Sequence, residues 1–342
     1  MQTPLKTPVV RAIDVGFGNT KYTTYVADGN IGCGMFPSIA PQAATGPDLS
    51  SGIFNNRLTV TVEVNGMKYE VGPDSRLAGD ANHGRVLDPG YCLTDTYTAL
   101  LRGALFYMGQ PEIDLLVLGL PVNIHKQHYK ELEAKFVGMH PVPLKNAKEC
   151  VVKHVKVIPQ PIGAFFDHSI HTRCYDRMRS QMNLLIDVGY YTLDWVVADG
   201  VKMNNARSDA ENGGMSSVLQ AMAKSLGDEL GENVPVSLVE KAVREGTPAE
   251  LYGKPQDLTE CTKVGKKKAE QFVSVLANRV GSSMDISNII LAGGGAAFFK
   301  DVLQAKFPKH KIVTTADPVF ANVRGFQRAG GTFIEQILNG MK

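Results

Sequence analysis

The sequence predicts an α/β protein made of two similar halves that share a cleft. The first reason is a repeat: "AIDVGFGNTKYTTYVADG" (12–29) returns in altered form as "LIDVGYYTLDWVVADG" (185–200), about half the chain later. The second is the alternation of apolar strand patterns with amphipathic helix patterns in both halves, which is typical of layered α/β folds. The third is a late strand, glycine turn and helix start in "NIILAGGGAAFF" (288–299).

The first half is expected to open with two β-hairpins. "VRAIDVG" is an apolar strand pattern, "GFGN" a turn, and "TKYTTYV" an alternating return strand. The second hairpin covers 57–72, with Asn65 and Gly66 as a type I′ turn. Residues 30–57 between the hairpins are rich in Gly, Pro, Ser and Ala, so we expect irregular loop there.

The rest of the first half predicts alternating helices and strands. These segments are a helix at 97–109 that ends in a glycine cap, an apolar strand at 114–122, an amphipathic helix at 129–140, and a strand, proline turn and helix at 151–168. Gln160 lies in that proline turn, between Pro159 and Pro161.

The second half repeats the plan. After the 185–200 hairpin, helical spacing of apolar residues predicts further helices at 214–231, 236–246, 267–283 and 328–340. The strand and triple glycine at 288–299 lie between the last two helices.

Composition allows two ordinary domains and favours no strongly charged partner. The chain has 342 residues, of which 44% are hydrophobic, and its formal net charge is +2 at pH 7. A DNA-coating surface would show a basic excess. The dense lysine cluster at 263–268 is typical of a solvated helix face. We therefore expect no direct contact with nucleic acid.

Cysteine usage and hydropathy favour the cytoplasm. The five cysteines are scattered and never spaced C-x-x-C, which suits free thiols in a reducing compartment. No apolar run approaches the roughly 20 residues that span a bilayer. The N-terminus lacks the basic and apolar pattern of a signal peptide. We expect a cytoplasmic protein without membrane contact.

The duplicated turn has a chemical use. A glycine turn lets backbone N–H groups approach a phosphate closely, although a single one can also close a hairpin for steric reasons alone. Two matched turns led by Asp14 and Asp187 favour a polyphosphate held from both sides. Carboxylates repel phosphate, so these two predict a divalent cation held through its water shell, as Mg²⁺ prefers. Lys21 could meet a phosphate as a point charge.

These motifs resemble the actin-like ATPase superfamily, which includes actin, DnaK-type chaperones and hexokinase-type sugar kinases. Within it, "VIPQPIGAFFD" and the "IDVG…TLD…DG" hairpin are similar to the ParM (StbA) family of plasmid-segregation actins. The opening "RAIDVGFGNTK" also resembles the protein D subfamily of PRTRC gene clusters. The resemblance implies an actin-like fold: two duplicated ribonuclease-H-like domains, a nucleotide cleft between them, and a small inserted subdomain in each.

The resemblance also implies domain limits. Domain I would cover 1–165, with its inserted subdomain at about 30–95. Domain II would cover 166–342, with its insertion at about 215–285, and the last helix would pack back towards domain I.

The resemblance assigns the site residues. Asp14 would lie in the second shell of Mg²⁺, and Lys21 would contact the β- or γ-phosphate. Gln160 would orient the attacking water, and Asp187 would hold the Mg²⁺ water shell and polarise the nucleophile. The other assigned residues would contact ATP or ADP: Gly16, Gly18 and Asn19 in the first turn, Gly189 and Thr192 in the second, Asn212, Gly213 and Gly214 before a helix, and Gly293, Gly294 and Gly295 at the adenosine.

One feature departs from the family pattern. Tyr190 and Tyr191 stand where many relatives have Gly, Ser or Thr, so bulky rings leave less room at the second turn. Asp194 follows shortly after, and its carboxylate is expected to cap or pin the hairpin, a functional role being the alternative.

The function implied is an ATP hydrolase that polymerises with bound nucleotide and moves plasmid DNA through a DNA-binding adaptor at a centromere-like site. A sugar kinase would need a catalytic Asp in a sugar-binding loop, and Asp95 and Asp114 lack such surroundings. A DnaK-type chaperone would need a further peptide-binding domain after "FIEQILNGMK". A non-filamentous scaffold or regulator of the same fold stays as the alternative, with a small-molecule kinase behind it.

Overall fold

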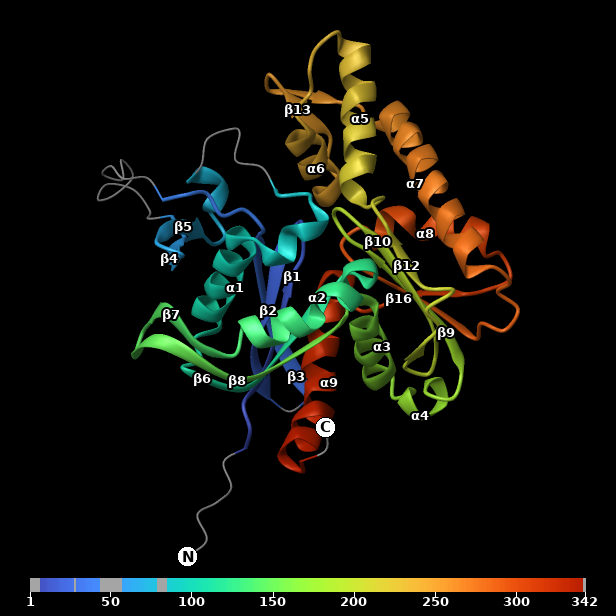
Figure 1. Cartoon of the computed structure of the whole chain (residues 1–342). Helices are drawn as coiled ribbons and strands as arrows, with labels where there is room; N and C mark the ends of the chain where they lie inside the picture. The colour runs from blue at the N-terminus through green and yellow to red at the C-terminus, as the bar shows by residue number, and fades with distance from the viewer. Residues whose placement is uncertain (1–6, 28, 44–56, 79–84, 341–342) are drawn as a thin grey trace, which may run out of the picture. The chain divides into compact units, whose positions relative to one another are not determined.

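The computed structural model describes residues 7–27, 29–43, 57–78 and 85–340 (Figure 1). The chain forms two compact units. Unit 1 consists of Met1–Tyr175 and Val319–Lys342, and unit 2 of Asp176–Pro318. The described helices include none that is both long enough and apolar enough to cross a membrane.

Unit 1 contains a six-stranded sheet in the order β3-β2-β1-β6-β8-β7. Its strands are β1 (Val10–Val15), β2 (Asn19–Ala27), β3 (Asn30–Pro37), β6 (Glu112–Leu120), β7 (Gly138–Leu144) and β8 (Ala147–Pro159). The first three strands are antiparallel neighbours, whereas β1, β6 and β8 run parallel. A separate hairpin joins β4 (Val60–Val64) to β5 (Met67–Val71). Its turn residues Asn65 and Gly66 have φ of 51° and 80°, which confirms the type I′ turn.

The first 3₁₀- and α-helices of unit 1 connect these strands. They are η1 (Ser75–Leu77), η2 (Pro89–Leu93), α1 (Asp95–Met108), α2 (Val122–Lys135) and α3 (Gln160–His171). The helix predicted at 97–109 is confirmed as α1, and Gly109 ends it with φ of 70°. The helix predicted at 129–140 is wrong at both ends. It begins at Val122 and ends at Lys135 with Phe136 as its C-cap, and Gly138, whose φ of 114° lies outside the helical region, starts β7.

The expected loop at 30–57 is wrong over its first part, because Asn30–Pro37 forms β3 against β2. The glycines that suggested a loop have another cause. A Cβ on Gly32 would lie 2.2 Å from the ring of Tyr25, and one on Gly34 would lie 2.5 Å from the ring of Tyr22. The β2 tyrosines therefore lie across glycine positions of β3. Residues 44–56 of the expected loop lie outside the described residues.

Helices α3 and α9 (Ala321–Leu338) pack side by side in unit 1 (Figure 1). A Cβ on Gly325 of α9 would lie 1.7 Å from the carbonyl oxygen of Gly163 in α3, so the two backbones touch. Asp167 and Arg324 add a bidentate ion pair between the helices, with a shortest distance of 2.7 Å. The last helix therefore belongs to unit 1. The domain limit expected at residue 165 lies inside α3, and the two compact units divide between Tyr175 and Asp176.

Unit 2 repeats the sheet of unit 1. Its order is β11-β10-β9-β15-β16, with β12 also paired to β10. The strands are β9 (Met182–Val188), β10 (Leu193–Asp199), β11 (Lys202–Met203), β12 (Asp209–Glu211), β15 (Asn288–Ala292) and β16 (Ile312–Thr314). As in unit 1, the two strands joined by the repeated turn, β9 and β10, are antiparallel, and β11 is antiparallel to β10. On the other side of β9, β15 and β16 run parallel to it. The order and directions match β3-β2-β1-β6-β8, so the duplication read from the two hairpins extends through five strands.

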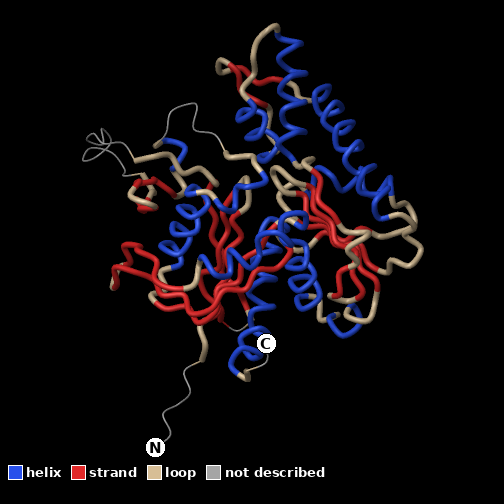
Figure 2. Tube along the Cα trace, in the orientation of Figure 1, coloured by secondary structure: helices blue, strands red, loops and turns tan. Residues whose placement is uncertain are grey.

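The helices of unit 2 share one hydrophobic core with its sheet. Figure 2 shows these helices in blue beside the strands of the sheet in red. The elements are α5 (Met215–Leu230), α6 (Val236–Glu245), α7 (Thr259–Val280), α8 (Ala296–Lys306) and the hairpin of β13 (Ala249–Leu251) and β14 (Lys254–Gln256). Short helices α4 (Tyr175–Met178) and η3 (Pro318–Phe320) lie where the chain enters and leaves unit 2. Core residues of α5, α6 and α7 pack with those of β9 and β10. Helices from the expected insertion at about 215–285 thus contribute to the same core as the sheet.

Candidate functional site

The first repeated turn brings three predicted residues together. Asp14 lies near the end of β1 and is fully buried. Its Oδ2 accepts a hydrogen bond from Lys21 Nζ at 2.8 Å, and its Oδ1 accepts one from Gln160 Nε2 at 2.7 Å. Lys21 is the cross-strand neighbour of Asp14, whereas Gln160 reaches it from the first position of α3. Both oxygens of this buried carboxylate are thus matched by donors, as a buried charge requires.

The contact with Asp14 sets the orientation of the Gln160 amide. An ionised carboxylate only accepts hydrogen bonds, so the NH₂ group must face it and the amide oxygen points elsewhere. Gln160 is 6% exposed and begins α3 directly, because Pro161 fits the first turn of a helix. Gly119 makes room chiefly for the ring of Phe326, 2.3 Å from a Cβ built there, and that Cβ would also lie 3.1 Å from Gln160 Cγ. The expected proline turn is therefore a strand-to-helix junction.

The carbonyl groups of the first turn are held from one side. Ser38, which directly follows β3, donates its hydroxyl to Gly16 O at 2.5 Å and its N–H to Gly18 O at 3.1 Å. In a trans peptide the N–H points opposite to the preceding C=O. These bonds therefore direct the N–H groups of Phe17 and Asn19 to the opposite face of the turn, as anion binding requires.

Ser38 was missed from the sequence because β3 was taken for loop. A signal was present: apolar residues at 31, 33 and 35 alternate with glycines, which is the period of a strand.

The second repeated turn is built the same way. Three of its carbonyl oxygens accept N–H groups at the start of α5: Gly189 O from Met215 at 3.1 Å, Tyr190 O from Ser216 at 2.7 Å, and Tyr191 O from Gly214 at 3.0 Å. The same stereochemistry directs the N–H groups of Tyr190, Tyr191 and Thr192 away from α5. The N–H groups at the start of α5 therefore hold the second turn.

Gly213 and Gly214 serve this attachment. A Cβ on Gly214 would lie 2.7 Å from the carbonyl oxygens of Gly189 and Tyr190, so a larger residue would push the turn off α5. A Cβ on Gly213 would lie 2.2 Å from the ring of Phe272. The N–H of Gly213 donates to Glu211 O at 2.7 Å. Gly214 thus holds the turn against α5, Gly213 is required by packing against Phe272, and Asn212 beside them is exposed.

The family departure at Tyr190 is accommodated by packing. Its side chain is half-buried and packs against the hydrophobic core of unit 2. The backbone of the turn can therefore keep its bonds to α5 with a tyrosine at this position.

The triple glycine wraps around the end of β9. Gly293 has φ of 90°, and a Cβ there would lie 2.2 Å from Asp187 Oδ1. The N–H of Gly295 donates to Val188 O at 2.9 Å. Gly294 between them is exposed. Close packing on β9 thus explains Gly293 and Gly295, and it leaves Gly294 without such a reason.

Asp187 faces a second carboxylate. It is 5% exposed, and its cross-strand neighbour is Asp194, which is 1% exposed. This pairing corresponds to that of Asp14 with Lys21 in unit 1. Directly opposite residues of an antiparallel pair point to the same face, where like charges destabilise each other. Thr192 of the same turn is also buried.

The residues near Asp187 fit Mg²⁺ in chemical type. Carboxylate oxygens are the donors that this ion takes, and Asp187 and Asp194 lie opposite each other on β9 and β10. Within the described part of the chain, no group of three or more His, Cys, Asp or Glu side chains could hold a metal. Mg²⁺ usually keeps several waters and takes few protein ligands, so a sparse donor set suits it. Asp14 fits less well, because both its oxygens already accept hydrogen bonds.

Comparison with known proteins places the fold. Residues 12–163 match the family described as "Actin like proteins N terminal domain", and residues 185–305 match "Archaeal actin homologue MreB-like, C-terminal". No curated protein sequence matches the chain. The actin-like fold predicted from the sequence is confirmed by these families and by solved structures.

Three solved structures illustrate the likeness. The archaeal actin homologue Ta0583 is 21% identical, with a TM-score of 0.76 over 95% of this chain and 99% of that one. A non-polymerisable quadruple mutant of pCBH ParM is 20% identical, with a TM-score of 0.73 over 96% and 100%. ParM in a 15-stranded filament from Clostridium botulinum is 20% identical, with a TM-score of 0.74 over 96% and 100%. Ta0583 has also been solved in complex with ADP. At these identities the likeness shows the fold alone.

Proposed function

Because the chain belongs to the actin-like superfamily, we propose that it is an ATP hydrolase that binds Mg·ATP with both repeated turns and assembles into filaments that segregate plasmid DNA. The observation that carries the proposal is the shared construction of the turns. In each, the carbonyl groups are bonded on one side and the N–H groups face the other, next to a buried aspartate. The ADP complex of Ta0583 supports a nucleotide as the ligand.

The first turn is suited to a phosphate. The N–H groups of Phe17 and Asn19 supply donors, and Lys21, whose side chain is 15% exposed, adds a positive charge close by. Its bond to Asp14 at 2.8 Å fixes the position of that charge. In this proposal Gly16 and Gly18 let the backbone approach the phosphate, while Asn212 and Gly294 are the exposed positions for the ribose and adenosine.

Hydrolysis in this proposal depends on Gln160. With its NH₂ group bonded to Asp14, the amide oxygen can accept a hydrogen bond from one water and aim it at the terminal phosphate. An amide orients water but is a poor base, so hydrolysis is expected to be slow. Mg²⁺, when bound, would neutralise charge that develops on the phosphates. Asp187 would hold the water shell of that ion and polarise the nucleophile.

Self-assembly and DNA segregation are the more distant part of the proposal. The filament of the ParM from Clostridium botulinum supports head-to-tail association of copies of this chain. A net charge of +2 supports contact with DNA through a separate adaptor at a centromere-like plasmid site. All five cysteines are free thiols, which supports a reducing compartment such as the cytoplasm.

The test combines nucleotide binding with assembly. Titration calorimetry with Mg·ATP should show binding by the unmodified protein and a loss of at least tenfold for Asp14→Ala and Asp14→Asn, in line with removal of a charged hydrogen-bonding group. Glu149→Ala, an exposed carboxylate of β8, is the matched control. Circular dichroism checks the fold of each variant. Unchanged affinity in the Asp14 variants would contradict the site.

Assembly is measured by high-speed pelleting and electron microscopy with a non-hydrolysable ATP analogue. Filaments that require nucleotide are expected. Nucleotide binding without pelleting would instead indicate the non-filamentous scaffold considered from the sequence.

A further inference from the structure

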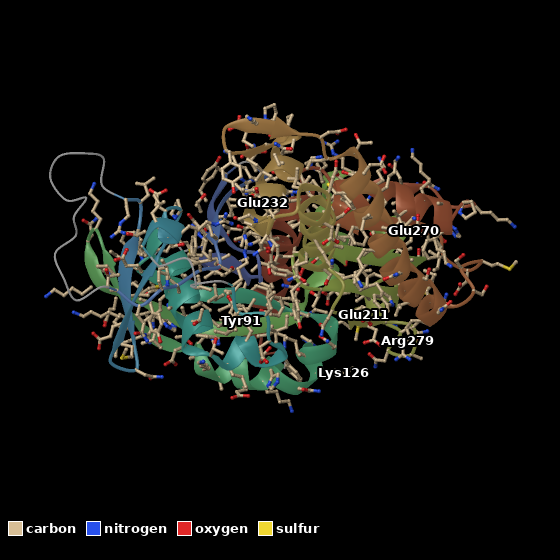
Figure 3. The ribbon with its side chains drawn as sticks, turned by 90° about the horizontal axis from the view of Figure 1, so that it is seen from above. Tyr91, Lys126, Glu211, Glu232, Glu270 and Arg279 are labelled. Atoms are coloured by element: carbon tan, nitrogen blue, oxygen red, sulfur yellow. The ribbon has the colours of Figure 1, made fainter. Side chains whose placement is uncertain are left out.

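A segment outside the sheet also contacts the first turn. Arg85 donates from Nε to Gly18 O at 3.0 Å. The ring of Tyr91, labelled in Figure 3, stacks on the ring of Phe17 with centroids 5.1 Å apart and planes 27° apart. Both rings are buried, at 3% and 8% exposure. Burial raises the pKa of the Tyr91 hydroxyl, and the nearby Arg85 charge opposes this rise.

This segment has a defined conformation of its own. It covers residues 85–93 and joins the β4–β5 hairpin region to α1. Asp88 caps η2 by accepting the N–H of Gly90 on its side chain at 2.7 Å and that of Tyr91 on its carbonyl at 3.0 Å. Tyr91 therefore approaches the turn from a capped 3₁₀-helix, and Arg85 precedes that cap by three residues.

Arg85 differs from the other group that holds the turn. Ser38 bonds Gly16 and Gly18 from the chain directly after β3, so it is part of the sheet construction. Arg85 reaches the same Gly18 oxygen with a long side chain that can be changed without altering a strand. The guanidinium approaches from the carbonyl side of the turn. The N–H groups that would meet a phosphate lie on the opposite side.

We propose that Arg85 is a positioning residue for nucleotide binding, which acts by holding the Gly18 carbonyl so that the first turn keeps its anion-binding conformation. The inference rests on the proposed function, since it presumes that this turn binds phosphate. The hydrogen bond from Nε carries the effect. The positive charge, on the far side of the turn from the ligand, is secondary.

Three substitutions separate the hydrogen bond from the charge. In Arg85→Gln the side-chain nitrogen is as many bonds from the backbone as Arg Nε, so the donor stays and the charge is lost. Arg85→Lys keeps the charge but moves the donor one bond further out. Arg85→Met removes both. Affinities for ATP, ADP and adenosine are measured by calorimetry, and thermal unfolding is measured without nucleotide. Adenosine has no phosphate, so it reports on the fold of the rest of the site.

Arg85→Met and Arg85→Lys should bind ATP and ADP about tenfold more weakly, as expected for the loss of one hydrogen bond from a charged donor. Arg85→Gln should restore the affinity to within about threefold. Adenosine affinity and the unfolding temperature should stay close to those of the parent protein in all three.

Several results would overturn the proposal. Normal ATP affinity in Arg85→Lys with weak affinity in Arg85→Gln would show that the charge acts. Normal affinity in all three, while Asp14→Asn binds poorly, would remove Arg85 from nucleotide binding and leave the proposed function intact. A fall in adenosine affinity or in unfolding temperature would show a general structural role. If the unmodified protein binds no nucleotide, the proposed function itself fails.

Discussion

The hydrogen bond between Gln160 and Asp14 predicts that a carboxylate at residue 160 is poorly tolerated. Gln160→Glu keeps the length of the side chain but replaces the NH₂ donor with an oxygen. That oxygen would lie where Nε2 now lies, 2.7 Å from Asp14 Oδ1. Both side chains are buried, with Gln160 6% and Asp14 0% exposed, so water screens the two charges little.

The cost follows from Coulomb's law and from proton uptake. At 2.7 Å and an effective dielectric constant of about 20, two unit charges repel by about 6 kcal/mol, which is an upper bound. The introduced carboxyl group can instead take up a proton, at about 1.4 kcal/mol for each pH unit above its ordinary pKa of about 4.3. Rotation of the introduced side chain away from Asp14 would relieve part of the remaining repulsion. We therefore expect a loss of about 2–4 kcal/mol in the free energy of unfolding at pH 8.

The sign of the pH dependence follows from linkage. Repulsion raises the pKa of the introduced carboxyl group in the folded state above its unfolded value. Protonation of this group then stabilises the folded variant at low pH, and this stabilisation is lost as the pH rises through the folded pKa. The difference in the free energy of unfolding between variant and parent should be below about 1 kcal/mol near pH 5, where the shared proton restores a hydrogen bond. It should grow toward pH 8.

Urea unfolding at pH 5, 6, 7 and 8 measures this difference. Gln160→Met is the matched control: it removes the hydrogen bond without adding a charge and should cost about 1.5–3 kcal/mol, varying little with pH. If the Gln160→Glu and Gln160→Met curves run parallel over this range, the contact with Asp14 does not exist in solution and the reasoning is refuted.

Two further predictions concern activity. Gln160→Ala should bind ATP and assemble, but its phosphate release should fall about 100-fold or more, as for loss of a positioned catalytic group, and its filaments should outlive those of the parent. Phosphate release measured beside light scattering checks this. Parental rates in both measurements would leave Asp187 as the candidate for activating the water. Gly294→Val should abolish nucleotide binding in calorimetry while circular dichroism stays unchanged, because Gly294 is exposed. Normal binding by Gly294→Val would show that the triple glycine only shapes the turn. Gly293→Ala should instead unfold at a clearly lower urea concentration, because residue 293 has φ of 90° and its Cβ would lie 2.2 Å from Asp187 Oδ1.

Local patterns were enough to predict much of this protein. The Asn65-Gly66 turn, the capped helix α1 and both Asp-led hairpins are confirmed, because turn chemistry and side-chain period act between residues a few positions apart. The first hairpin sequence recurs in the second half of the chain, and this recurrence predicted the duplicated sheet.

Residue types alone could also select the candidate site, since acids at the ends of apolar strand patterns and glycines at turns can be read from the sequence. They could not assign each glycine a role. Gly213, Gly214, Gly293 and Gly295 are all explained by a neighbour that leaves no room for a Cβ. Those neighbours are Phe272, the second turn, Asp187 and Val188, and the sequence does not show which of them packs against which glycine.

Only the tertiary structure determined the contacts that connect distant segments. Gln160 meets Asp14 across 146 positions, Arg85 meets Gly18 across 67, and Gly325 touches Gly163 between two helices. Glycines in β3 resembled a loop until the rings of Tyr22 and Tyr25 were found lying across them. Sequence patterns report propensity and period, which are properties of neighbours along the chain. Hydrogen bonds and steric exclusion between segments depend on where folding places them in space, and that placement is a property of the whole packed unit.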